Sequence, residues 1–161
     1  MTTTAEHSAA TTFTLSGDRE IVMTRAFAAP RELVWRASTE AEHFANWWGP
    51  RGFANRVTEM DVRPGGRWEC VQTAPDGSVH RFWGEYLEVV RPERLVHTQR
   101  YLEYPPLHVT VTFETQAGGG TLLTSVTRFD SPEGRAGMLG AGMEWGAREA
   151  YDRLAELVAT L

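Results

Sequence analysis

The sequence contains no lysine and only one cysteine, and its basic residues and its cysteine content each argue against certain kinds of site or partner. All sixteen basic residues are arginines scattered along the chain, and the formal net charge is −5. Nucleic-acid-binding domains usually carry a basic stripe or patch, so we expect no nucleic-acid partner. A lone Cys70 allows neither an internal disulfide nor a Cys-rich zinc site, and it suits a reducing compartment.

Long apolar runs are also missing. No stretch approaches the roughly 18 apolar residues of a membrane span, so we expect no membrane partner. The opening MTTTAEHSAATTFTLSGD lacks the basic and apolar regions of a signal peptide, which predicts a cytoplasmic protein. We expect residues 1–12, rich in Thr and Ala, to form a disordered tail, and residues 13–161 to form a single domain.

The sequence lacks the common catalytic and nucleotide-binding motifs. G-x-S-x-G, H-E-x-x-H, GxxxxGK[ST] and G-x-G-x-x-G are all absent, and the spacing of His43, His80 and His108 does not suit a metal site. We therefore assign no catalytic residue, no metal and no cofactor. The best candidate for an acid or base is His97, with three carboxylates as candidate partners, Glu59, Asp61 and Glu85.

The order of the predicted elements indicates an α+β fold. Residues 21–28 read as a strand, followed by a helix near Pro30 and a second short helix that begins at the capping-box pattern Thr39-Glu40-Ala41-Glu42. From residue 53 to 130, about six strand candidates alternate with Gly- and Pro-rich breakers. These short connections favour an antiparallel sheet.

The end of the chain predicts a long amphipathic helix. Ser131-Pro132-Glu133 is a typical helix start, and the apolar positions that follow step by four and three: Met143, Ala147, Ala150, Leu154, Leu157 and Leu161. Four glycines lie in its first half: Gly137, Gly140, Gly142 and Gly146. Either the helix begins late, or these glycines leave space beside Met138, Leu139 and Met143.

Several ordered segments resemble one known family. APRELVWRASTEAEHFANWWGPRGF, DVRPGGRWE, PDGS, GEYLEVVRPERLVHT and GMEWGAREAYDRLAELVATL together resemble the AHSA1-like (activator of Hsp90 ATPase homologue 1-like) branch of the START/Bet v 1-like, polyketide-cyclase-type superfamily. The resemblance runs from about Phe13 to Leu161. It implies a helix-grip fold, in which a curved antiparallel sheet of about six to seven strands surrounds a long C-terminal helix, with two short helices after the first strand. It also implies a central cavity that often takes an apolar small molecule, but no shared catalytic constellation.

Two adjacent tryptophans, Trp47 and Trp48, stand before Gly49-Pro50 in EHFANWWGPRGF. Neither a helix nor a strand points both toward one core. In a helix-grip fold, one could fix the second short helix while the other lines the cavity mouth. The alternative is that both simply fill the end of the sheet.

Strand alternation predicts which side chains share a face. The sets are Trp68, Cys70 and Gln72; Phe82, Gly84 and Tyr86; and Leu95, His97, Gln99 and Tyr101. The resemblance implies that these faces point toward the long helix, so polar groups would enter the concave side. Several buried polar groups indicate either a hydrogen-bond network or a pocket with a polar ligand. For Gly84, a bend of the sheet is favoured over close approach of a ligand.

We therefore predict a binding site for a small apolar or amphipathic molecule. Its candidate residues are Trp47, Trp48, Trp68, Cys70, Phe82, His97, Gln99, Tyr101, Met138 and Met143. One alternative is an enzyme that acts on a small aromatic or polyketide-like metabolite in the same cavity, and another is a chaperone-associated (Hsp90-type) interaction module. A homodimer through Trp35, Trp145 or an edge strand is also compatible with the sequence.

Overall fold

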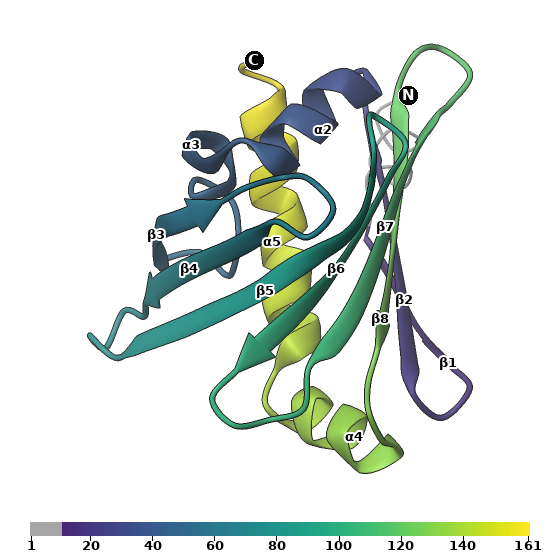
Figure 1. Ribbon diagram of the computed structural model, residues 1–161. Helices are drawn as coiled ribbons and strands as arrows, with labels where there is room; N and C mark the ends of the chain where they lie inside the picture. The colour runs from purple at the N-terminus through teal and green to yellow at the C-terminus, as the bar shows by residue number, and fades with distance from the viewer. Residues whose placement is uncertain (1–10) are drawn as a thin grey trace.

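Eight antiparallel strands form one curved sheet, and the helices lie on its concave side (Figure 1). The computed structural model describes residues 11–161 and confirms the predicted helix-grip fold. The elements are β1 (Thr12–Ser16), β2 (Glu20–Phe27), α2 (Arg31–Thr39), α3 (Ala41–Phe44), β3 (Ala54–Met60), β4 (Arg67–Thr73), β5 (Val79–Val90), β6 (Arg94–Tyr101), β7 (Leu107–Thr115), β8 (Thr121–Arg128), α4 (Pro132–Gly140) and α5 (Met143–Val158).

The strands follow the order β1-β2-β8-β7-β6-β5-β4-β3, so only the β2–β8 pair joins strands that are distant in sequence. The prediction of six to seven strands missed β1, which pairs with β2 and starts at Thr12. The predicted tail reached residue 12, yet Thr11 is buried and Thr12 is already in the sheet. The rest of that tail, residues 1–10, lies outside the described part of the chain.

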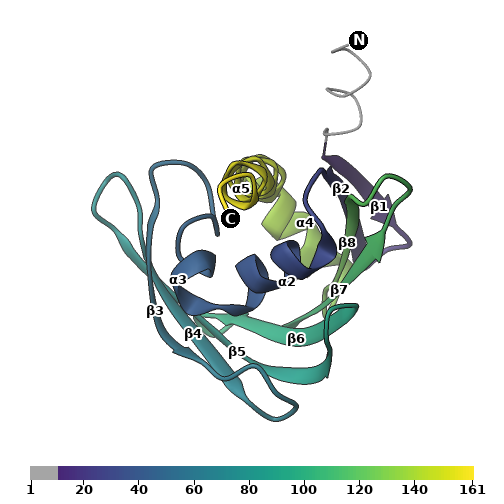
Figure 2. The same ribbon diagram turned by 90° about the horizontal axis from the view of Figure 1, so that it is seen from above.

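Two short helices lie between β2 and β3. Seen from above, α2 and α3 sit within the curve of the sheet (Figure 2). The predicted capping box at Thr39 is wrong, because its hydroxyl donates to the Trp35 carbonyl oxygen, one turn back in α2. Glu40 takes the N-cap position of α3, with no side-chain cap.

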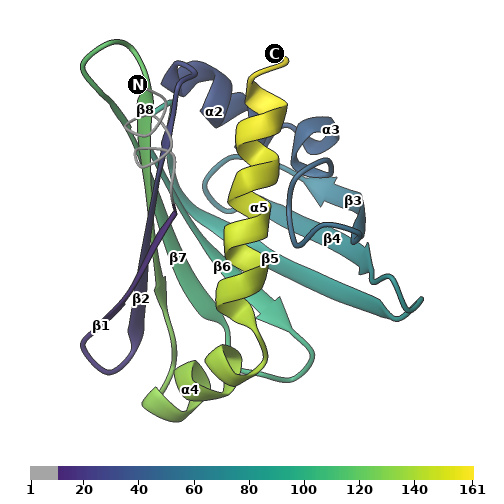
Figure 3. The ribbon, with the colours of Figure 1, turned by 180° about the vertical axis from the view of Figure 1, so that it is seen from behind.

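The last helical region is two helices. Ser131 caps α4 as predicted, since its hydroxyl accepts a hydrogen bond from the backbone N–H of Gly134. Gly142 then adopts a left-handed conformation with φ of 90°, and α5 starts at Met143. The long helix therefore begins late, and it runs along the open side of the sheet (Figure 3).

The main core lies between the sheet, α2 and α5, around Val34, Phe113, Leu123 and Leu154. A smaller cluster joins Ile21, Met23 and Phe129 to the α4–α5 corner, where Met138 and Met143 pack against it. Over residues 11–161, no helix has both the length and the apolar content needed to cross a membrane. The space between the two clusters is not completely filled.

Candidate functional site

A cavity of about 190 Å³ lies between the concave face of the sheet and α5. Strands β2 to β8, helices α2, α3 and α5, and the segment after α3 all contribute to its wall. The apolar lining residues are Met23, Phe44, Trp47, Trp48, Met60, Trp68, Leu95, Leu107, Val109, Val111, Phe113, Leu123, Met143, Ala147 and Ala150. Apolar walls with a few polar groups are typical of small-molecule sites.

The polar groups of the wall are all neutral side chains or a histidine. They are Ser38, Tyr86, His97, Gln99, Ser125, Thr127 and Tyr151. Strand pairing joins Tyr86 to His97, His97 to Val109, and Val109 to Thr127, so these residues form one row across β5 to β8. Within the described part of the chain, no Asp, Glu or Arg lines the cavity. Such a wall favours an uncharged occupant, because an unpaired buried charge is costly.

Both tryptophans of the NWWGP stretch line the cavity, but they are held differently. Trp47 is buried, and its Nε1–H donates to the Ala37 carbonyl oxygen of α2 at 2.8 Å. Trp48 is only half-buried and stacks on Phe44, with ring centroids 5.4 Å apart. One tryptophan thus joins α2 to the end of α3, and its neighbour belongs to an aromatic wall.

This aromatic wall continues from Trp48 across the sheet. Trp68 and Phe82 both meet the Trp48 ring edge to face, at 5.8 and 5.0 Å. Phe82 in turn stacks on Tyr101 at 4.9 Å. Such pairs add about 0.5–1.5 kcal/mol each beyond the apolar area that they bury. The wall therefore has a fixed shape on this side of the cavity.

Gly84 creates an unusual feature in the sheet, next to the cavity residues Trp68 and His97. The pairing of β5 with β6 runs through Trp83–Arg100 and resumes at Tyr86–His97. Between these pairs, the Glu85 N–H donates to the hydroxyl of Thr98 at 3.0 Å. A Cβ atom on Gly84 would overlap the carbonyl oxygen of Thr98. The close approach at Gly84 is therefore made by the backbone of β6. It is not made by a ligand, and it is not a simple bend of the sheet.

The Thr98 carbonyl oxygen accepts two hydrogen bonds from cavity residues. Nε1 of Trp68 donates to it at 3.0 Å, and Nδ1 of His97 lies 3.2 Å away. Burial lowers the pKa of His97 from 6.5 to about 4, an effect that the Thr98 carbonyl opposes. His97 is therefore neutral near pH 7. The predicted carboxylate partners of His97 are wrong: Asp61 bonds Arg63, and Glu59 and Glu85 are exposed.

Tyr151 and Tyr86 bring phenolic hydroxyls to the wall. Burial raises the pKa of Tyr151, an effect that a hydrogen bond with Ser125 on β8 opposes. Burial also raises the pKa of Tyr86, and the charge of Asp61 adds to this shift. Both hydroxyls stay protonated at neutral pH, so each can donate or accept a hydrogen bond.

The structure brings six of the ten predicted site residues to the cavity: Trp47, Trp48, Trp68, His97, Gln99 and Met143. The other four do not line it. Phe82 and Tyr101 lie behind Trp48 in the aromatic wall, and Met138 packs into the smaller core cluster. Cys70 is fully buried, with its thiol 3.5 Å from Oδ1 of Asn55.

Gln72, expected on the same face, also turns away from the cavity. Its side-chain amide donates to Oδ1 of Asn55 at 2.9 Å. Asn55 in turn donates to the Trp48 carbonyl oxygen at 2.6 Å and to the Ala45 carbonyl oxygen at 3.1 Å. These polar groups form a hydrogen-bond network that supports the segment with Trp47 and Trp48. For this part of the concave face, the polar side chains therefore form an internal network, which was one of the two predicted alternatives.

The prediction missed most of the wall formed by β7, β8 and α5. The alternation of Leu107, Val109, Val111 and Phe113 was present in the sequence as a signal for one buried face. Tyr151 lies four residues after Ala147 on α5, so helical spacing could have found it. Met23 and Thr127 line the cavity only because β2 pairs with β8, a contact that spans most of the chain.

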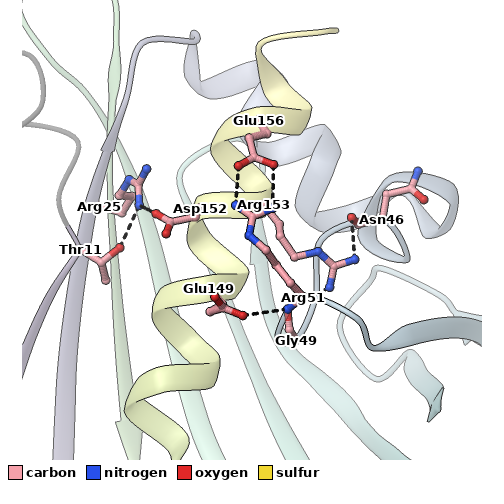
Figure 4. A network of polar contacts seen from close by, with 9 residues as sticks. All are labelled: Thr11, Arg25, Asn46, Gly49, Arg51, Glu149, Asp152, Arg153 and Glu156. Carbon is pink, nitrogen blue, oxygen red and sulfur yellow. Dashed lines mark hydrogen bonds and ion pairs between the residues drawn. The ribbon is translucent and has the colours of Figure 1, made fainter. Parts of the chain in front are cut away.

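Segment 45–53, here named the tryptophan loop, is tied to α5 by two arginines (Figure 4). Arg153 donates to the carbonyl oxygens of Asn46, Gly49 and Pro50 at 3.1, 3.0 and 2.9 Å. Arg51 reaches back from the loop to the carboxylate of Glu156, at 3.0 and 2.5 Å, and its backbone N–H donates to Glu149. These contacts hold the loop, and hence Trp47 and Trp48, against the helix.

A second ion pair ties the other side of α5 to the sheet (Figure 4). Arg25 of β2 is buried and donates to Asp152 at 2.5 Å and to the hydroxyl of Thr11 at 3.1 Å. Charge-assisted hydrogen bonds are stronger than neutral ones, and loss of the half-exposed Asp152 would leave the buried Arg25 charge without this partner. Polar contacts thus hold α5 on both sides, while its apolar face closes the cavity.

A group with metal-ligand chemistry lies outside the cavity, at α3. Glu40, Glu42 and His43 each bring one potential ligand atom, all within 4.8 Å of one another. Glu40 already pairs with Arg36 at 3.2 Å and with His43 at 3.4 Å. The Glu40 carboxylate therefore already has two side-chain partners in this cluster.

The curved sheet, the long C-terminal helix packed against it and the cavity between them define a helix-grip protein. The chain belongs to the family described as activator of Hsp90 ATPase homolog 1-like protein, whose sequence pattern matches residues 28–159. No curated protein matches the sequence.

Solved structures of similar proteins agree with this family and fold. A Rhodobacter sphaeroides protein is 26% identical, with a TM-score of 0.85 over 94% of this chain and 99% of that one. A Chromobacterium violaceum protein is 31% identical, with a TM-score of 0.74 over 88% and 98% of the two chains. An AHSA1 protein from Silicibacter pomeroyi is 20% identical, with a TM-score of 0.73 over 88% and 98%, and shares the fold.

Proposed function

We propose that this chain binds a small apolar or amphipathic molecule in the cavity between the sheet and α5. The observation that carries the proposal is the cavity itself, about 190 Å³ with mainly aromatic and aliphatic walls. A cavity of roughly 150 Å³ lined by apolar side chains is enough to bind benzene. The volume therefore suits a molecule with about one ring, and transfer of its apolar surface from water supplies the driving force.

The large aromatic side chains surround this space instead of occupying it, which supports the proposal. Trp47 and Trp68 are held at the wall by hydrogen bonds to backbone carbonyl oxygens. Trp83 lies under the guanidinium of Arg81, at 4.2 Å from its ring centroid, and Tyr101 stacks on Phe82. None of the four can fill the cavity without the loss of these contacts.

The geometry of the cavity supports the enzymatic alternative less well than it supports ligand binding. It requires a carboxylate or hydroxyl partner that would position His97 as an acid or base. The hydrogen bond of its Nδ1 goes instead to a backbone carbonyl oxygen, and burial keeps the ring neutral. Binding without turnover is therefore the function that we propose.

A cavity-filling variant gives the sharpest test. Ala147 lines the cavity from α5, so Ala147→Leu would place a larger side chain in the ligand volume. Ala159→Leu, at the exposed C-cap of the same helix, is the matched control. We expect native mass spectrometry, with small-molecule analysis of the denatured sample, to find a stoichiometric compound in the wild type and the control, and to find none in Ala147→Leu.

Titration with p-xylene extends the test to protein purified without a compound. Saturable binding to the wild type and to Ala159→Leu, but not to Ala147→Leu, would support the cavity as the site. If neither p-xylene nor p-cresol, which carries a hydroxyl in place of one methyl group, binds the wild type, or if p-xylene binds all three proteins equally, the proposed function is wrong.

A further inference from the structure

His97 has a fixed hydrogen-bonding role in the cavity. Its Nδ1 lies 3.2 Å from the Thr98 carbonyl oxygen, which can only accept, so Nδ1 carries the proton. Burial lowers the pKa of this histidine to about 4, so the ring holds one proton at neutral pH. Its other nitrogen, Nε2, is then an acceptor. No side chain or backbone group in residues 11–161 donates to it.

The backbone holds the ring in this state. Because Gly84 has no Cβ, the Thr98 carbonyl oxygen can approach β5 and receive both Nδ1 of His97 and Nε1 of Trp68. The Trp68 ring lies nearly perpendicular to the imidazole, at 87° and 5.8 Å. Rotation of the imidazole would break the hydrogen bond and the aromatic contact together.

Most of the other polar groups of the wall do not set a direction. The amide of Gln99 and the hydroxyls of Tyr86, Ser125 and Tyr151 can each donate or accept. His97 presents a nitrogen that can only accept, and Ser38 shares this property because its hydroxyl already donates to the Val34 carbonyl oxygen at 2.8 Å. An occupant that donates to Nε2 gains a hydrogen bond that an occupant without a donor cannot make, so the donor is preferred.

We propose that the cavity takes an uncharged, single-ring phenol whose hydroxyl donates to Nε2 of His97. The inference rests on the proposed ligand-binding function, and it adds the polar group of the ligand and the residue that recognises it. A cavity of about 190 Å³ holds one aromatic ring with a small substituent. The absence of Asp, Glu and Arg from the described wall disfavours a carboxylate or an amine.

Two probes of nearly the same shape separate this inference from simple apolar binding. p-Cresol and p-xylene differ by a hydroxyl in place of a methyl group, and only p-cresol can donate. Sites built to bond a hydroxyl discriminate against analogues that lack it. Calorimetric titration of the wild type and of His97→Phe gives the ratio of the p-xylene Kd to the p-cresol Kd in each protein.

We expect His97→Phe to lower this ratio about 10-fold, which corresponds to about 1.4 kcal/mol, while the Kd of p-xylene changes less than about threefold. Binding of p-xylene also shows that the variant is folded with its cavity intact. p-Toluate, which has a carboxylate at the same place, should bind the wild type at least about 100-fold more weakly than p-cresol.

An NMR measurement on the wild type keeps the test independent of the variant. The ¹⁵N resonance of Nε2 should lie at the position of an unprotonated imidazole nitrogen, and it should move upfield with p-cresol but not with p-xylene. If p-xylene binds but the Kd ratio is the same in both proteins, or if p-toluate binds more tightly than p-cresol, the phenol assignment is wrong and ligand binding stands. If neither aromatic binds the wild type, both proposals are wrong.

Discussion

Gly84 and Thr98 face each other across β5 and β6 so closely that no side chain fits between them. The Thr98 carbonyl oxygen occupies the position that a Cβ on residue 84 would need, and that Cβ would also lie 2.6 Å from Nε1 of Trp68. Both atoms belong to a hydrogen bond that holds Trp68 at the cavity wall. This glycine therefore connects the sheet to the orientation of two site residues.

Gly84→Ala should destabilise the protein by about 3 kcal/mol, because the clash is with backbone that cannot rotate away. Urea unfolding followed by tryptophan fluorescence would measure the free energy of unfolding. Gly137→Ala is the control, since its Cβ would meet nothing within 4 Å and its helical backbone favours alanine. The control should gain about 0.5–1 kcal/mol. Equal stability of Gly84→Ala and the wild type would contradict the argument.

Arg153→Met should loosen the tryptophan loop. The variant removes the hydrogen bonds to the carbonyl oxygens of Asn46, Gly49 and Pro50, and we expect a loss of about 2 kcal/mol in the free energy of unfolding. Limited proteolysis should also cut the loop faster. Arg36→Met, which breaks only an exposed i,i+4 pair with Glu40, should cost less than about 0.5 kcal/mol. Similar losses in both variants would show that the Arg153 contacts add no more than a surface ion pair.

The sequence predicted those parts of the site that depend on local periodicity. Trp68, His97 and Gln99 line the cavity because alternation along a strand is a local rule. Phe82 and Tyr101 obey the same rule, yet they pack behind Trp48 instead of facing the cavity. Their position depends on how the sheet curves and where the loop after α3 lies, which local periodicity does not contain.

Two further features could not be predicted from residue patterns, each for its own reason. The inward Thr98 carbonyl requires Gly84 on the neighbouring strand, and alternation cannot foresee an interrupted pairing. The Thr39 hydroxyl can either cap α3 or donate back into α2, and in the structure it donates to the Trp35 carbonyl oxygen. By contrast, the Ser131 cap was predictable because no helix directly precedes Ser131, so its hydroxyl has no helical carbonyl oxygen one turn back to bond.

Cys70 should be inert toward thiol reagents in the folded protein. It is fully buried, and burial raises the pKa of its thiol to about 11, so the reactive thiolate is scarce at pH 8. Absorbance assays with an aromatic disulfide reagent should show no reaction over the time in which the urea-unfolded chain reacts completely. Rapid modification of the native protein would contradict the burial of this residue.

His97 should make the protein less stable as the pH falls from 6.5 to about 4. In the unfolded chain its pKa is near 6.5, and in the folded protein burial lowers the pKa to about 4. Within that window the unfolded state binds a proton that the folded state does not, so acidification favours unfolding by about 3 kcal/mol in total. Above pH 6.5 the residue is neutral in both states and contributes no pH dependence.

His97→Phe isolates this effect because the carboxylates that also titrate in acid are the same in both proteins. The free energy of unfolding of the variant minus that of the wild type should rise by about 3 kcal/mol between pH 7 and pH 4. Urea titrations at half-unit pH steps would measure this difference. A difference that stays constant over the window would mean that His97 is protonated as readily in the folded protein as in the unfolded chain. In that case Nε2 would be protonated below about pH 6.5, and its role as an acceptor would be confined to higher pH.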